Sequence, residues 1–227
     1  MNPDSLKDLL LSSGATLTGI GDVTEALSGD IRHLTRGIAI AVRKDLNRDT
    51  VEFLLGIQGL IEAWLRKKNY RFLSIPPDSD RRNGKFVSRL YEFFSHKTAA
   101  TCAGLGWIGK NGLIINSRYG PKLSWATVLT DAPFMTDRPI TRSLCGDCNL
   151  CVRHCPSNAL TGTSWSINEP FSEIVIYSRC SSLKKKRTVF NNKPNCGLCI
   201  NICPYARKVY KNNKRERIYL KESRSCQ

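Results

Sequence analysis

The sequence contains no hydrophobic run long enough to cross a membrane. Its longest apolar stretch, around Ile38 to Val42, falls far short of the roughly 20 residues that span a bilayer. The N-terminus also lacks the features of a secretory signal, because Asp4 and Asp8 stand where a basic region would precede an apolar core. These absences predict a cytoplasmic protein with no membrane segment.

Acidic residues are scarce as well. The chain of 227 residues has 19 Asp and Glu against 35 Lys and Arg, a formal net charge of +16. This excess favours an anionic partner, such as nucleic acid, an acidic redox protein or a phosphorylated cofactor. A content of 41% hydrophobic and 24% charged residues is ordinary for globular proteins and excludes a largely disordered or fibrous chain.

Alternating helix and strand patterns fill the first 135 residues. Apolar periodicity predicts helices before Gly14, over 49–68 and over 86–102, and strands over 15–20, 37–42, 70–75, 112–116 and 123–130. Such alternation indicates an α+β or layered α/β domain. The predicted division is 1–135 for this domain, 136–205 for a cysteine-rich module and 206–227 for a basic tail.

Ten cysteines make the composition unusual. The run from Cys145 to Pro156 matches the bacterial ferredoxin pattern C-x2-C-x2-C-x3-C-P, and the run from Cys196 to Pro204 retains C-x2-C-x3-C-P. Cys180 is available to complete the second run. Because the last cysteine of each run ligates the other cluster in two-cluster ferredoxins, the spacing predicts two 4Fe–4S ligand sets: Cys145, Cys148, Cys151 and Cys203; and Cys155, Cys180, Cys196 and Cys199.

The alternative for these cysteines is a pair of structural zinc sites, since zinc also accepts four thiolates from C-x2-C pairs. Three cysteines at C-x2-C-x2-C followed by Cys-Pro are typical of clusters rather than of zinc. The segment has few large apolar residues, so the bound metal must supply much of its folding energy. Of the two remaining cysteines, Cys102 is expected to be a buried small hydrophobe and Cys226 an idle thiol.

A glycine-rich turn runs from Gly104 to Lys110 and satisfies G-x-G-x-x-G. A nucleotide site is disfavoured, because a predicted helix precedes the turn and a strand follows it, the reverse of a dinucleotide fingerprint. A turn without Cβ atoms can approach a flat ligand closely, although a tight packing turn explains the spacing equally well. His96, on the preceding predicted helix, is a candidate to face this site, with a structural role as the favoured alternative.

The sequence resembles one enzyme family over nearly its whole length. The segments that carry the likeness are AGLGWIGKN, CGDCNLCVRHCP and CGLCINICP. They resemble the epoxyqueuosine reductase family and its shorter relatives, and more distantly the reductive dehalogenases. The resemblance implies a nitroreductase-like cobalamin domain followed by a ferredoxin-like double-cluster module. It also implies a cofactor site near Gly104, Gly106, Trp107, Gly109, Lys110 and His96.

Two departures from the family pattern concern the reaction. The family's acidic proton donor precedes the AGLGW motif in a D-x-A-P context that this chain lacks, which leaves Glu92 and Tyr91 as candidate catalytic residues. The chain also stops soon after the second cysteine run, without the helical repeats that many family members use with tRNA. The substrate is therefore left open.

The resulting hypothesis is a cobalamin-dependent iron–sulfur oxidoreductase of the epoxyqueuosine reductase or reductive dehalogenase type. The alternative is a ferredoxin-like electron-transfer protein without its own catalytic cofactor. Expected partners are an electron donor of the ferredoxin or flavodoxin type and a tRNA held by the basic tail and by Lys184 to Arg187.

Overall fold

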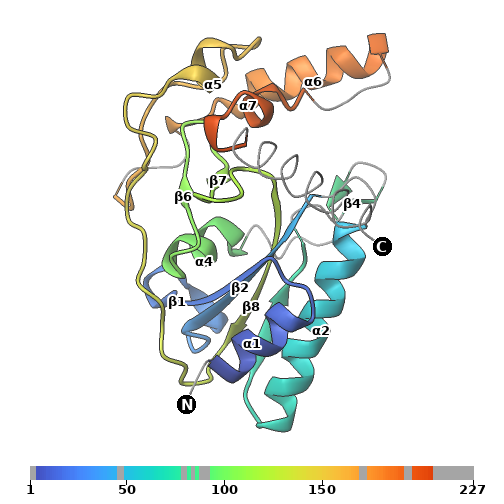
Figure 1. Ribbon diagram of the computed structural model, residues 1–227, viewed down its shortest axis with the longest axis vertical. Helices are drawn as coiled ribbons and strands as arrows, with labels where there is room; N and C mark the ends of the chain where they lie inside the picture. Colours follow the sequence, from blue (N-terminus) through green and yellow to red (C-terminus); the bar gives the residue numbers. More distant parts are fainter. Residues whose placement is uncertain are drawn as a thin grey trace, which may run out of the picture. The chain divides into compact units, whose positions relative to one another are not determined.

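The computed structural model describes residues 4–44, 49–77, 81–82, 85–86, 93–168, 173–191 and 196–206 (Figure 1). The chain divides into two compact units. The first unit comprises residues 1–107 and 123–141, and the second comprises 108–122 and 142–227. This grouping places residues 108–122 with the cysteine-rich segment, whereas the sequence pattern assigns all of residues 1–135 to the first domain.

A four-stranded sheet forms the centre of the first unit. Its order is β1 (Leu17–Asp22), β2 (Arg36–Arg43), β8 (Leu123–Thr130) and β3 (Phe72–Ile75), and every neighbouring pair is antiparallel. All eight residues of β8 are buried, as expected for an inner strand covered on both faces. The α+β class predicted from the sequence is confirmed.

Two helices, α1 (Asp4–Ser12) and α2 (Thr50–Lys67), cover one face of this sheet (Figure 1). Alternation along β2 points Ile38, Ile40 and Val42 into this layer. They pack against buried leucines and isoleucines of the helices: Leu6, Leu10, Leu54, Ile57, Ile61 and Leu65. The side chain of Asp49 caps α2 by accepting hydrogen bonds from the first-turn backbone N–H groups.

The opposite face of the sheet carries α4 (His96–Cys102) and two short 3-10 helices, Thr24–Ala26 and Gly29–Ile31. Small residues line this face. A Cβ at Gly21 would lie 2.5 Å from the Cβ of Cys102, and one at Gly37 would lie 2.9 Å from Val23 Cγ1. The absence of these Cβ atoms lets α4 approach the strands closely.

The start of α4 corrects the sequence-based prediction of a helix over 86–102. Ser95 accepts a hydrogen bond from the backbone N–H of Lys97, and the helix begins at His96. Lys85–Phe86 form β5, which pairs with β4 (Arg81–Arg82). Residues 87–92 lie outside the described part of the chain.

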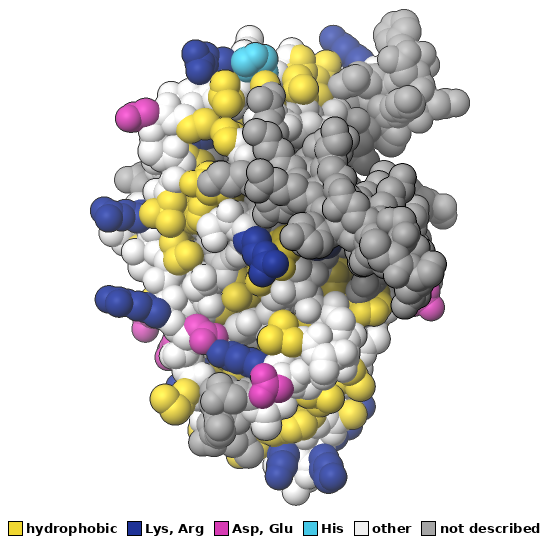
Figure 2. Space-filling view, in the orientation of Figure 1, with side chains coloured by type: hydrophobic (Ala, Val, Ile, Leu, Met, Phe, Trp, Pro, Cys, Tyr) yellow, Lys and Arg dark blue, Asp and Glu magenta, His cyan; other side chains and the backbone are white. Residues whose placement is uncertain are grey.

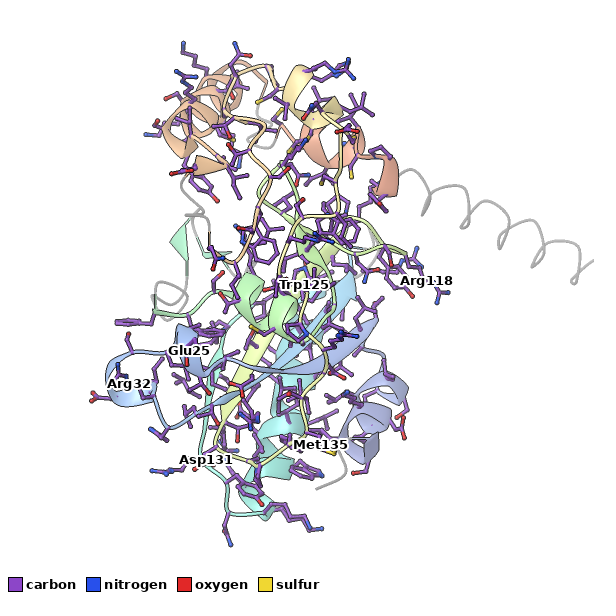
Figure 3. All side chains as sticks on the ribbon, turned by 90° about the vertical axis from the view of Figure 1, so that its left-hand side faces the viewer. Glu25, Arg32, Arg118, Trp125, Asp131 and Met135 are labelled. Atoms are coloured by element: carbon purple, nitrogen blue, oxygen red, sulfur yellow. The ribbon has the colours of Figure 1, made fainter. Side chains whose placement is uncertain are left out.

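The second unit contains short elements joined by turns. The hairpin β6 (Trp107–Ile108) and β7 (Ile114–Ile115) leads to the turn that carries Arg118, which points away from the ribbon in Figure 3. The cysteine-rich segment adds α5 (Leu150–Arg153), α6 (Tyr177–Asn191) and α7 (Leu198–Asn201). Of the helices in the described ranges, none combines the length and apolar character needed to cross a bilayer.

Candidate metal centre

The two cysteine runs begin with the same local structure. Each starts with Cys-Gly-x-Cys, and the glycines Gly146 and Gly197 have left-handed φ angles of 53° and 61°. Glycine adopts this conformation without the steric cost of a Cβ atom. A four-residue helix follows in each case, α5 in the first run and α7 in the second. The two runs thus share the left-handed glycine, whereas α5 begins after Cys148 and α7 begins one residue before Cys199.

Four of the predicted ligands surround one pocket. The pocket has a volume of about 250 Å³ and is lined by Cys145, Cys148, Cys151 and Cys203, together with Lys110, Asn111, Ile115, Pro204 and Tyr205. Cys203 belongs to the second run and joins three thiols of the first. A cubane of four iron and four sulfide atoms fits such a space.

The other four predicted ligands form a second group. Burial raises the pKa of the Cys199 thiol to about 11, and the neighbouring thiols of Cys180, Cys196 and Cys155 add to the shift. These electrostatic effects place the three thiols around Cys199. Both predicted ligand sets are thus brought together, and the ligation itself stays a prediction.

The two groups of thiols are close neighbours within the second unit. Burial raises the pKa of Cys151 to about 11, with further contributions from Cys145, Cys199, Cys203 and Cys148 in that order. Cys199 belongs to the second group, and its effect on Cys151 indicates that the groups adjoin. Cofactors held at both places would lie within reach of each other for electron transfer.

Cys155 differs from the other ligand candidates. Burial acts to raise its pKa, but hydrogen bonds outweigh burial and lower it. Its Sγ lies 3.5 Å from Ser157 Oγ and accepts a hydrogen bond of 3.4 Å from the backbone N–H of Ala159. These hydrogen bonds favour the thiolate, which is the form of cysteine that binds metals. Within the described ranges, no three His, Cys, Asp or Glu side chains meet tightly enough for a single metal ion.

Lys110 and Asn111 connect the glycine-rich turn to both cysteine runs. The Lys110 ammonium donates hydrogen bonds of 2.9 Å to the Gly146 carbonyl and of 2.9 Å to Asn149 Oδ1. The Asn111 amide donates a hydrogen bond of 3.2 Å to the carbonyl oxygen of Cys199. Sequence reasoning missed this role, and the only local signal was the Lys-Asn pair directly after the turn.

The other residues assigned to a corrinoid site pack closely against other segments of the protein. A Cβ at Gly104 would lie 2.4 Å from the Arg138 carbonyl oxygen, and one at Gly109 would lie 2.7 Å from Ile115 Cγ1. Gly106 and Trp107 are buried. These contacts agree with the interpretation of the segment as a tight packing turn. A cofactor role for these residues stays a prediction.

His96 is also held inside the first unit. Its Nδ1 lies 2.8 Å from Thr127 Oγ1, and its Nε2 lies 2.8 Å from the Pro76 carbonyl oxygen. Both ring nitrogens thus have partners, which agrees with a structural role for His96. The candidate catalytic residues Tyr91 and Glu92, Cys226 and residues 207–227 lie outside the described part of the chain.

Two adjoining groups of four thiols are the arrangement expected for a double-cluster iron–sulfur module. Residues 144–206 match the family described as "4Fe-4S double cluster binding domain". This match covers all eight predicted ligands, the seven cysteines of the two runs and Cys180 between them. The double-cluster module predicted from the cysteine spacing is confirmed.

Comparison with known proteins confirms the resemblance to epoxyqueuosine reductases. The epoxyqueuosine reductase of Listeria monocytogenes is 34% identical over 114 residues, which are 50% of this chain and 30% of that protein. The chain therefore matches about a third of the length of this curated relative.

Solved structures show the same likeness at the level of the fold. A crystal structure of epoxyqueuosine reductase with an epoxyqueuosine-modified tRNA-Tyr stem loop has a TM-score of 0.60 at 21% identity, covering 90% of this chain and 65% of the other. The catabolic reductive dehalogenase NpRdhA has a TM-score of 0.62 at 21% identity, covering 89% of this chain and 32% of the other.

Proposed function

We propose that this chain is an iron–sulfur oxidoreductase with two 4Fe–4S clusters. The observation that carries the proposal is the pocket of about 250 Å³ bordered by thiols from both cysteine runs. Bound clusters supply one-electron transfer. The chain's own residues hold the two cofactors side by side: Cys145, Cys148, Cys151 and Cys203 at one centre, and Cys155, Cys180, Cys196 and Cys199 at the other.

The cluster content is tested on protein purified without oxygen. Eight thiolates in two sets predict close to eight iron and eight acid-labile sulfide per chain, about four of each per cluster. The variant Cys102→Ala is the matched control, because Cys102 belongs to neither group of thiols, and it is expected to keep the full content. Stoichiometric zinc, or four iron per chain, would contradict the double-cluster assignment.

We further propose a corrinoid as the electron acceptor in the first unit. The support is the fold likeness to epoxyqueuosine reductase and to a reductive dehalogenase described as carrying out B12-dependent dehalogenation. A corrinoid supplies a strongly reducing cobalt centre. Titration of the clustered protein with cobalamin is expected to give a base-off spectrum and retention on a desalting column.

A second candidate function is electron transfer without a catalytic cofactor. The observation that favours it is that residues assigned to the corrinoid site form hydrogen bonds within the protein. Lys110 contacts the first cysteine run, and His96 contacts Thr127 and Pro76. Cobalamin that passes through the column with an unchanged spectrum would support this function over the reductase.

The anionic partners are proposed to bind the second unit. Helix α6 exposes Arg179, Lys184, Lys185 and Lys186 near the thiol of Cys180. Figure 2 shows other Lys and Arg side chains spread over one face rather than gathered in a single patch. An acidic ferredoxin or flavodoxin donor, or a tRNA like the stem loop bound by the solved relative, fits this surface. Affinity that falls steeply with salt is the expected signature.

A cytoplasmic location is part of the same proposal. The nine cysteines in the described ranges are all free of disulfides. Cysteines at cluster spacing are typical of reducing compartments, where disulfides are rare.

A further inference from the structure

A buried ammonium group borders the pocket of the first four thiols. Lys110 is 6% exposed and lines this pocket with Cys145, Cys148, Cys151 and Cys203. Its two hydrogen-bond acceptors, the Gly146 carbonyl and Asn149 Oδ1, are both neutral oxygens. Burying a charge without an opposite charge is costly, so this arrangement calls for a compensating negative group.

We propose that Lys110 raises the reduction potential of the cluster at Cys145, Cys148, Cys151 and Cys203. This inference rests on the proposed function. A cluster with four thiolates is anionic and gains one further negative charge when it accepts an electron. A positive charge beside it stabilises the reduced form more than the oxidised form, and burial keeps solvent from screening the effect.

The next residue, Asn111, also lines the pocket of the first four thiols, but its side-chain hydrogen bond goes to the second group. Asn111 reaches it with a neutral amide, which donates to the Cys199 carbonyl oxygen. Two adjacent residues therefore contribute a charge at one centre and an uncharged hydrogen bond at the other. This difference separates the potentials of two otherwise similar clusters. Electrons would pass from the cluster at Cys199 to the cluster beside Lys110.

The competing explanation is that Lys110 only clamps the loop from Gly146 to Asn149. Charge and hydrogen bonding can be separated by substitution. Lys110→Arg keeps the positive charge, Lys110→Gln keeps a donor without the charge, and Lys110→Met keeps the bulk of the stem alone. Arg118→Gln removes one positive charge from an exposed turn of the same unit and serves as the matched control.

The experiment is a redox titration of the two-cluster protein followed by electron paramagnetic resonance. Lys110→Gln is expected to lower the equilibrium constant for reduction of one cluster at least tenfold, which corresponds to about 59 mV for one electron. The other cluster should keep its potential. Lys110→Arg and Arg118→Gln should each leave both potentials within a threefold change in that constant.

Three results would overturn the inference. Lys110→Gln could carry eight iron with both potentials unchanged, or Lys110→Arg could shift the potential as far as Lys110→Gln does. Alternatively, both neutral variants could fail to bind iron at one centre while Lys110→Arg binds it fully, which would assign Lys110 a structural role. A wild-type protein without two clusters would instead refute the proposed function, so the two failures are distinguishable.

Discussion

The two units of this protein are stabilised by different means. Among the described residues, twelve large side chains are fully buried; ten of them lie in the first unit, and Ile115 and Ile174 lie in the second. Both hydrophobic core clusters belong to the first unit. The second unit buries fewer large apolar side chains, and the hydrogen bonds of Lys110 and Asn111 join its segments around the thiols. The first unit can therefore fold by apolar burial, whereas the second depends on what its cysteines bind.

Removal of iron is expected to have the largest effect and tests this contrast directly. Chelation under reducing conditions should raise amide hydrogen exchange in α5 and α7 by about a hundredfold or more, because metal binding supplies the folding free energy there. Exchange in β2 and β8 should change much less. Mass spectrometry of peptides from each unit measures both. An equal rise in both units would show that they share one folding transition.

Loss of one ligand should affect half of the metal. Cys180→Ala is expected to lower the iron content from about eight to about four per chain, because Cys180 completes the second four-thiol group. Ser181→Ala, its exposed neighbour on α6, is the matched control and should keep all the iron. Iron analysis and the absorbance of the purified variants measure the outcome. A Cys180→Ala protein with two intact clusters would remove this residue from the ligand set.

A cavity in the first unit should lower stability and leave the metal in place. Leu54 is fully buried in α2, and Leu54→Ala is expected to cost about 2–5 kcal/mol of unfolding free energy through lost burial and the cavity left behind. Leu55, 44% exposed on the same helix, gives the control Leu55→Ala with an effect below about 1 kcal/mol. Urea denaturation measures both. A large loss of iron in Leu54→Ala would show that the second unit depends on this core.

The sequence predicted several regular elements and the double-cluster module well, and for physical reasons. The run 123–130 is uncharged, rich in aliphatic and β-branched residues, and follows Pro121, so its limits match β8. The ligand sets follow from local spacing that repeats a known pattern. In contrast, the strands predicted over 112–116 and 15–20 are observed as β7 (Ile114–Ile115) and β1 (Leu17–Asp22), because their ends are set by pairing partners.

Contacts between distant segments could not be predicted. The hydrogen bonds of Lys110 to Gly146 and of Asn111 to Cys199 join residues that are 36 and 88 positions apart. No local periodicity encodes such contacts. The glycine-rich turn therefore suggested a ligand, whereas the geometry shows that its last residues bind the cysteine runs.

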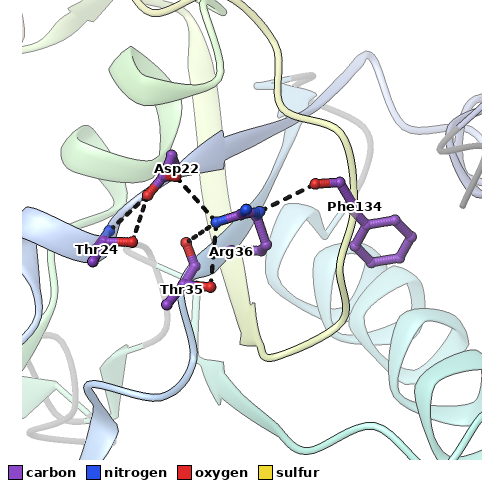
Figure 4. A network of polar contacts seen from close by, with 5 residues as sticks. All are labelled: Asp22, Thr24, Thr35, Arg36 and Phe134. Atoms are coloured by element: carbon purple, nitrogen blue, oxygen red, sulfur yellow. Dashed lines mark hydrogen bonds and ion pairs between the residues drawn. The ribbon is translucent and has the colours of Figure 1, made fainter.

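The smallest expected effect concerns a polar network at the end of the first unit's sheet (Figure 4). Asp22 Oδ1 accepts hydrogen bonds from the Thr24 backbone N–H at 3.0 Å and from Thr24 Oγ1 at 2.6 Å. Asp22 Oδ2 accepts one from Arg36 Nη1 at 3.1 Å. The hydrogen bonds from Thr24 lower the pKa of Asp22 below its usual 3.8. Burial opposes them, and the Arg36 charge adds a smaller lowering effect.

A carboxylate with a lowered folded-state pKa stabilises the fold fully above its unfolded-state pKa, and this contribution is lost as the pH falls through the folded-state value. The Asp22 side chain is 54% exposed, so solvent screens the pair and Asp22→Asn should cost below about 1 kcal/mol at pH 7. The difference from wild type should shrink as the pH falls below about 4. Urea denaturation of the first unit at several pH values measures it, with Asp30→Asn as the exposed control. A difference that persists at pH 2 would show that Asp22 acts through shape and neutral hydrogen bonds rather than through its charge.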